Sequence, residues 1–95
     1  MSLYVMLTKL TDEGAKTIKD NPERILEVDK EMEAFGLKVV HQLAVLGTYD
    51  FVNIVEAPDN LAVARASIEL GRRGTLRIMT LPAMEMSEFV AQLRG

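Results

Sequence analysis

The stretch formed by residues 46–59 constrains the fold of this chain more than any other part of the sequence. It holds a turn at Gly47-Thr48, a run of strand-forming residues over 49–56, and then Pro58-Asp59, a pair typical of a helix start. Residues 38–46 before the turn also have the composition of a strand. Because two residues are too few for a crossover, the two strands must be antiparallel. The sequence therefore predicts a β-hairpin followed by a helix.

The first third of the chain predicts a strand and a broken helix. Residues 3–9 are rich in strand formers and end at a capping threonine followed by acids. Apolar positions then recur at steps of three and four, which predicts a helix that stops at Gly36. Pro22 cannot continue that helix because its ring clashes with the carbonyl four residues back. We expect a break within residues 19–23, with Asn21 as the cap of the restarted helix.

The last third predicts a helix, a strand and a short terminal helix. Residues 60–71 carry small side chains suited to close packing on a sheet, residues 75–81 are a strand that Pro82 ends, and Ser87 is the expected cap of the terminal helix. The order β-α-β-β-α-β is that of the ferredoxin-like split unit. For residues 1–95 we therefore predict one domain of the α+β class, with an antiparallel sheet in strand order 4-1-3-2.

Composition bears on the compartment and on several classes of partner. No apolar run approaches the roughly 20 residues of a membrane span, and no basic segment precedes the first strand, so neither a membrane anchor nor a signal peptide is expected. The absence of cysteine fits a reducing cytoplasm. The formal net charge of −3 argues against nucleic acid as a partner. One histidine without cysteine makes a poor transition-metal site, and we expect neither metal nor cofactor.

Both faces of the predicted sheet are apolar. In the first strand Leu3, Val5 and Leu7 point to one side, while Tyr4 and Met6 point to the other. Both helices of this topology cover the same face, so the second face would be a large exposed apolar patch. We expect a homo-oligomer in which two sheets meet and enclose a cavity. The terminal helix or a further oligomer contact is the competing cover.

Several motifs resemble the GYD domain family, a small prokaryotic family without a characterised function. The motifs are Leu46-Gly47-Thr48-Tyr49-Asp50, Ile54-Val55-Glu56-Ala57-Pro58-Asp59, Leu70-Gly71 and Gly74-Thr75-Leu76-Arg77, with Leu10-Thr11-Asp12-Glu13-Gly14, Asn21-Pro22-Glu23-Arg24 and Ser87-Glu88-Phe89 near the ends. The resemblance covers nearly the whole chain. It implies the dimeric α+β barrel fold, whose members include cofactor-free oxygenases, haem enzymes, isomerases and sensors.

We interpret the named motif mainly as a structural one. Gly47 supplies a backbone position with positive φ, Asp50 accepts hydrogen bonds from turn or strand-end amides, and Tyr49 packs with its hydroxyl at a rim. In the alternative, Tyr49 binds a ligand at the mouth of the cavity. Arg77 lies within a strand, where it would pair with Glu56 or Asp50 or hold a bound anion.

Five residues are candidates for lining a ligand cavity: Tyr4, His41, Tyr49, Phe51 and Asn53. His41 could act as a general base near neutral pH, although a solvated or satisfied histidine is the commoner case. A buried Asn53 must find hydrogen-bond partners, either in a ligand or across a dimer interface.

The chain carries no catalytic signature, and we consider three functions from different classes. We favour a small oligomeric binding or sensing module that holds a small, largely apolar ligand between two sheets. The alternative is a cofactor-free enzyme of the oxygenase or isomerase kind, with His41 as base and Asn53 or Tyr49 as oxyanion donor. The least favoured is an RNA binder that presents Tyr4, Tyr49 and Phe51 on an open sheet, which the acidic charge opposes.

Overall fold

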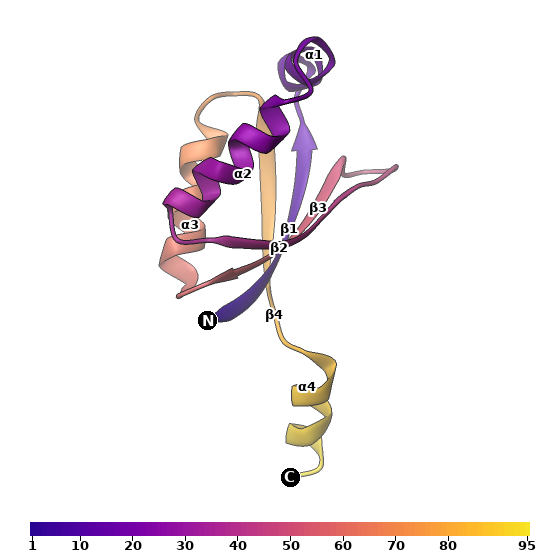
Figure 1. The fold of residues 1–95 in the computed structure, drawn as a ribbon. Helices are drawn as coiled ribbons and strands as arrows, with labels where there is room; N and C mark the ends of the chain where they lie inside the picture. The colour runs from indigo at the N-terminus through magenta and orange to yellow at the C-terminus, as the bar shows by residue number, and fades with distance from the viewer.

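A computed structural model describes residues 1–95 as a four-stranded antiparallel sheet with helices on one face (Figure 1). The elements in chain order are β1 (Ser2–Leu10), α1 (Asp12–Asp20), α2 (Arg24–Ala34), β2 (Lys38–Ala44), β3 (Phe51–Ala57), α3 (Asn60–Gly71), β4 (Leu76–Ala83) and α4 (Met86–Leu93). The strands lie in the order β2-β3-β1-β4, which is 4-1-3-2 when read from the other edge. The predicted α+β class, ferredoxin-like arrangement and strand order are confirmed.

The expected break in the first helix is confirmed, although the restart differs in detail. The chain leaves α1 at Asp20 and enters α2 at Arg24. The prediction that Asn21 caps the restarted helix is wrong, because Asn21 ends α1, where its amide donates to the carbonyl of Thr17. Asn21, Pro22 and Glu23 instead form a turn whose carbonyls accept from the first amides of α2.

Gly36 ends α2 as expected, through a Schellman motif. It adopts a φ of +86° and donates to the carbonyl of Glu33, while Leu37 donates to the carbonyl of Met32 at 3.1 Å. The side chains of Met32 and Leu37 are both 1% exposed. The turn therefore also delivers two apolar side chains to the core.

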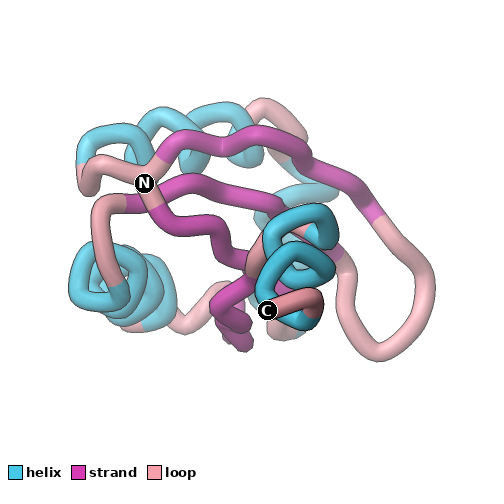
Figure 2. The backbone as a smooth tube through the Cα atoms, turned by 90° about the horizontal axis from the view of Figure 1, so that it is seen from below, coloured by secondary structure: helices cyan, strands magenta, loops and turns pink.

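Three boundaries differ from those predicted. The β2–β3 connection is longer than Gly47-Thr48: residues 45–50 leave the strands and form a protruding loop (Figures 1 and 2). Pro82 lies within β4 instead of ending it, since β4 is an edge strand and a missing amide proton there interrupts no ladder. The terminal helix begins at Met86 without a side-chain cap, so the prediction that Ser87 caps it is wrong.

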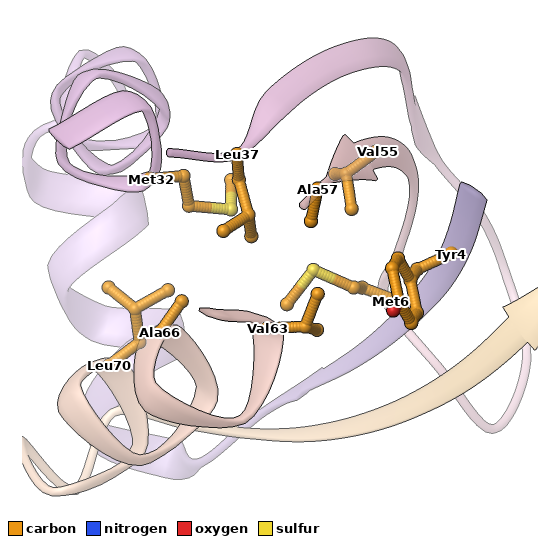
Figure 3. Close-up of a cluster of buried hydrophobic side chains, with 9 residues drawn as sticks. All are labelled: Tyr4, Met6, Met32, Leu37, Val55, Ala57, Val63, Ala66 and Leu70. Carbon is orange, nitrogen blue, oxygen red and sulfur yellow. The ribbon is translucent and has the colours of Figure 1, made fainter. Parts of the chain in front are cut away.

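The core lies between the sheet and α2 and α3. Met32 and Leu37 approach from one side, α3 residues from a second, and Tyr4, Met6, Val55 and Ala57 from the sheet (Figure 3). The side chains of β1 that face the helices are buried, whereas Leu3, Val5 and Leu7 on the other face are only half-buried. The helices thus cover one face of the sheet and leave the other without a layer.

Candidate functional site

The uncovered side of the sheet, called the open face below, is an apolar surface. Its apolar members are Leu3, Val5, Leu7, Leu43, Val52, Ile54, Met79 and Leu81. The same face carries His41 beside them and Lys9, Lys38, Glu56 and Arg77 toward its ends. The strand register places them in rows: Val5 lies opposite both Ile54 and Leu81, and the next row repeats the pattern through Leu7. The outer positions are the most accessible, with Leu43 54%, Met79 50% and Leu81 44% exposed. The middle rows of this face therefore lack the polar side chains expected of a strand surface that meets water.

The terminal helix does not cover this face within one copy of the chain. None of its residues is buried, and it stands beyond the end of β4, apart from the other helices (Figure 1). Its apolar side chains Phe89, Val90 and Leu93 are 44%, 36% and 71% exposed. The chain accordingly presents two unpartnered apolar elements, the open face and α4. The longest helix has 12 residues, and no helix combines the length and hydropathy that a membrane crossing requires.

The five candidate cavity residues do not converge on one site. Tyr4 is in the core, where its hydroxyl donates to Oδ1 of Asn60 at 2.6 Å. Phe51 and Asn53 face the helices, whereas His41 lies opposite Ile54 on the open face and is exposed. His41 and Asn53 therefore cannot share a site within one chain, because their side chains point to opposite sides of the sheet.

This placement bears on two of the functions considered from sequence. His41 has no Asn53 beside it as an oxyanion donor, so the proposed pairing of these two residues is not assembled within the chain. Of the three rings considered for RNA binding, Tyr4 and Phe51 point toward the helices, and only Tyr49 lies beside the open face. No group of three or more His, Asp or Glu side chains is arranged to hold a metal ion.

Tyr49 lies in the β2–β3 loop beside the open face. Its hydroxyl donates to the sulfur of Met79 at 3.4 Å, an exposed contact that leaves the oxygen accessible. Gly47 lies in the same loop with a φ of +135°, as the structural interpretation predicted. Asp50 accepts from the backbone amide of Leu10, so its predicted strand-end role is confirmed.

Arg77 has no acidic partner, and the pairing with Glu56 or Asp50 is wrong. Its guanidinium donates to the carbonyls of Gly71 and Leu76 at 3.3 and 3.1 Å. The register explains the difference, since Arg77 lies beside Lys9 at one end of the sheet and Glu56 lies beside Leu3 toward the other. Asp50 is already bonded to Leu10.

Sequence reasoning missed a backbone contact between the start of α1 and the entry to β4. Thr11 caps α1 by accepting from the amide of Gly14, and its hydroxyl donates to the carbonyl of Gly74 at 2.8 Å. A Cβ on Gly14 would lie 1.8 Å from the carbonyl oxygen of Thr75. The two family-like motifs 10–14 and 74–77 therefore meet at a close backbone contact.

A cavity of about 100 Å³ lies between the helix-covered face of the sheet and α1, α2 and α3. Met6, Thr8, Phe51 and Asn53 belong to its sheet side, and Ile18, Ile25, Val28, Met32 and Leu70 to its helix side. Asn53 is 6% exposed, and its Oδ1 is buried without a hydrogen-bond partner. The sequence-based expectation that Asn53 lines a cavity between two sheets does not hold within the chain, because Asn53 faces the helices together with Met6.

An ion-pair cluster borders the same cavity. Glu31 pairs with Arg24 at 3.0 Å and with Arg73, and Arg24 also pairs with Glu27 at 2.8 Å. The hydrogen bond from Arg73 lowers the pKa of Glu31, while burial raises the pKa of Asp29 on the same helix. No pattern in the sequence points to this cluster, because Arg73 comes from the turn after α3 and Glu31 from the middle of α2.

Two comparisons found proteins similar to this chain in sequence. The profile of the GYD domain matches residues 4–93. A relative from Thermus thermophilus is 50% identical over 95 residues, which cover 99% of this chain and 100% of the relative. That relative carries the name glutamine synthetase and cystathionine beta-lyase binding protein.

Proposed function

Because the chain belongs to the GYD domain family, we propose that it is a homo-oligomeric binding protein whose main partner is another protein. The observation that carries this proposal is the open face, an apolar surface that no helix of the same copy covers, α4 included. Apolar patches of this kind mark interaction sites in soluble proteins. The proposal gives the protein a binding role in place of a catalytic one.

A second copy of the chain is the occupant that we assign to the open face. With strands about 4.8 Å apart and a rise of about 3.3 Å per residue, four strands of roughly seven residues present about 450 Å² in projection. A stable dimer buries about 800 Å² on each partner. The face alone falls short of that area in projection, and α4 supplies further apolar surface through Phe89, Val90 and Leu93. We therefore assign both elements to the contact between copies.

The relative from Thermus thermophilus supports a protein as the further partner. Its name states that it binds glutamine synthetase and cystathionine beta-lyase, and its sequence aligns with this chain along its whole length. We take these two enzymes as the candidate partners of this protein. A cytoplasmic location, expected from the cysteine-free sequence, belongs to the same proposal.

A small apolar ligand between two sheets is the narrower function predicted from sequence. Between two open faces it would meet apolar side chains and the imidazole of His41, since Tyr4 and Asn53 face the helices. Few polar groups would remain there to orient it. We therefore place the binding of a protein ahead of it.

The assembly is tested by light scattering on the full chain at micromolar concentration. The wild type should exceed the 10.6 kDa mass of one chain, and the double variant Met79→Glu/Leu81→Glu should approach that mass while its circular dichroism stays unchanged. Ile68→Glu is the matched control, because Ile68 is 73% exposed on α3 and away from the open face. A monomeric wild type, or dissociation by Ile68→Glu alone, would contradict the assembly.

The partner is tested separately by titrating immobilised protein with each purified enzyme from the same organism. Saturable binding of either enzyme, unaffected by an unrelated enzyme of similar charge, is the expected result. If neither enzyme binds the oligomer, the assignment of these partners fails even where the assembly holds.

A further inference from the structure

We propose that the cavity behind the sheet is a binding site for a small neutral molecule that is mostly apolar and carries one hydrogen-bond donor. This site is separate from the open face and does not depend on the assembly proposed above. Its starting point is the Oδ1 atom of Asn53, which is buried and has no partner. Leaving such an atom unpaired is costly, so a partner that the chain itself does not supply is expected there.

The neighbours of Asn53 do not satisfy this oxygen. Gln42 lies directly opposite Asn53 in the sheet, but its amide nitrogen donates to Oδ1 of Asp29 at 2.9 Å. On β1, Met6 pairs with Asn53, and Thr8 is the next residue of that strand on the same face. Thr8 is 5% exposed and also borders the cavity. The polar floor of the cavity is therefore formed by one amide and one hydroxyl, and the amide oxygen requires a donor.

The rest of the lining defines the remainder of the molecule. Met6, Ile25, Val28, Leu70 and Ile78 surround the space with apolar groups. The cavity of about 100 Å³ is several times the roughly 10–15 Å³ that one water needs, yet smaller than the roughly 300 Å³ at which drug-sized pockets begin. A molecule of the size of a five-membered ring suits this space.

The border of the cavity excludes a net charge on the ligand. Arg24 and Arg73 both line it, but their two positive charges are matched by the carboxylates of Glu27 and Glu31. An anion would have to displace Glu31 from two guanidinium groups, and a cation would meet those guanidinium groups directly. A neutral ligand with an O–H or N–H group meets neither obstacle.

The test uses three probes built on one five-membered ring, added to the 95-residue chain labelled with ¹⁵N: cyclopentanol, cyclopentanone and cyclopentanecarboxylate. Cyclopentanol donates a hydrogen bond, cyclopentanone only accepts one, and the third is an anion. We expect saturable amide shift changes with cyclopentanol around Thr8, Phe51 and Asn53. Cyclopentanone should bind roughly 2- to 12-fold more weakly, the range set by one net hydrogen bond, and the anion should not bind.

Asn53→Leu should remove the preference for cyclopentanol over cyclopentanone, because it keeps the shape and removes the oxygen. Asn21→Leu is the control, since Asn21 is exposed and outside the cavity.

Should Asn53→Leu fail to fold, Val28→Phe provides a second test, because it fills the cavity from α2 and should abolish binding of both neutral probes. Equal affinity for alcohol and ketone in the wild type, binding of the anion, or shifts confined to the open face would overturn the proposal. So would a crystal structure in which cyclopentanol leaves ordered water on Asn53 undisturbed.

Discussion

The carboxylate of Asp50 accepts a hydrogen bond from the backbone amide of Leu10 at 2.8 Å, and so joins the β2–β3 loop to the last residue of β1. The backbone of Asp50 adds two more bonds, since its amide donates to the carbonyl of Thr8 and its carbonyl accepts from Val45. The protruding loop is thereby anchored at one end on the central strand. The aspartate of the named motif is thus a structural residue.

Asp50→Ala should lower the free energy of unfolding by about 2 kcal/mol, because the amide of Leu10 loses a charged acceptor in a half-buried position. Tyr49→Phe should change it by less than about 0.5 kcal/mol, since only an exposed contact with Met79 is lost. Urea unfolding of both variants measures the difference. Equal effects of the two substitutions would argue against an anchoring role for Asp50.

Glycine replacements should separate steric from conformational effects. Gly14→Ala should be the most harmful, because its Cβ would lie 1.8 Å from a backbone oxygen that cannot move without shifting the entry to β4. Gly47→Ala should cost about 1 kcal/mol, since a φ of +135° is unfavourable but nothing lies within 4 Å. Gly71→Ala has neither problem and should be neutral or slightly stabilising. Thermal denaturation should rank the three in this order, and a Gly14→Ala protein as stable as Gly71→Ala would refute the packing argument.

Removal of residues 85–95 should leave the fold intact and weaken the assembly. No residue of α4 is buried, so its loss exposes no core side chain of the same copy. We expect unchanged circular dichroism together with a lower molar mass in light scattering at equal concentration. A truncated chain that unfolds would show that α4 stabilises the protomer, and one that assembles as the wild type does would remove α4 from the interface.

The ion pairs of Glu31 should make stability depend on pH. Because Arg73 lowers the pKa of Glu31 in the folded state, the stabilisation is present above the unfolded value of about 4.3 and is lost as the pH falls through the lowered folded value. Glu31→Gln should therefore cost about 1 kcal/mol at pH 7 and progressively less below about pH 4. Urea unfolding of wild type and variant at several pH values measures this convergence.

Asp29→Asn is the matched control on the same helix. Burial raises the pKa of Asp29, because the charged carboxylate is disfavoured in the folded state. The charge on Asp29 therefore destabilises the folded protein at pH values above this raised pKa. The amide keeps an acceptor for Gln42, and the variant should be as stable as the wild type or more stable at about pH 7. A loss of stability that matches that of Glu31→Gln would show that any acid on this face contributes equally.

Local chemistry accounts for what could be predicted from the sequence. A proline in the interior of a helix breaks it, as Pro22 does here. Gly36 and Gly47 adopt positive φ because their turns require it. The order of strands and helices limits the topology. The same local reasoning failed at Pro82, because whether a proline ends a strand depends on whether that strand lies at an edge. It failed at Asn21 because a residue between two helices can cap either one.

The identity of the elements, the strand order and the excess of apolar residues on both faces of the sheet could all be read from the residues in order. Which face the helices cover depended on the packed structure, since successive residues of a strand point to opposite sides and both sides are apolar here. That choice placed Asn53 beside the cavity under the helices, left His41 on the open face and separated Tyr4 from Tyr49. A site is formed by residues distant in sequence, and their meeting depends on packing that no local pattern encodes.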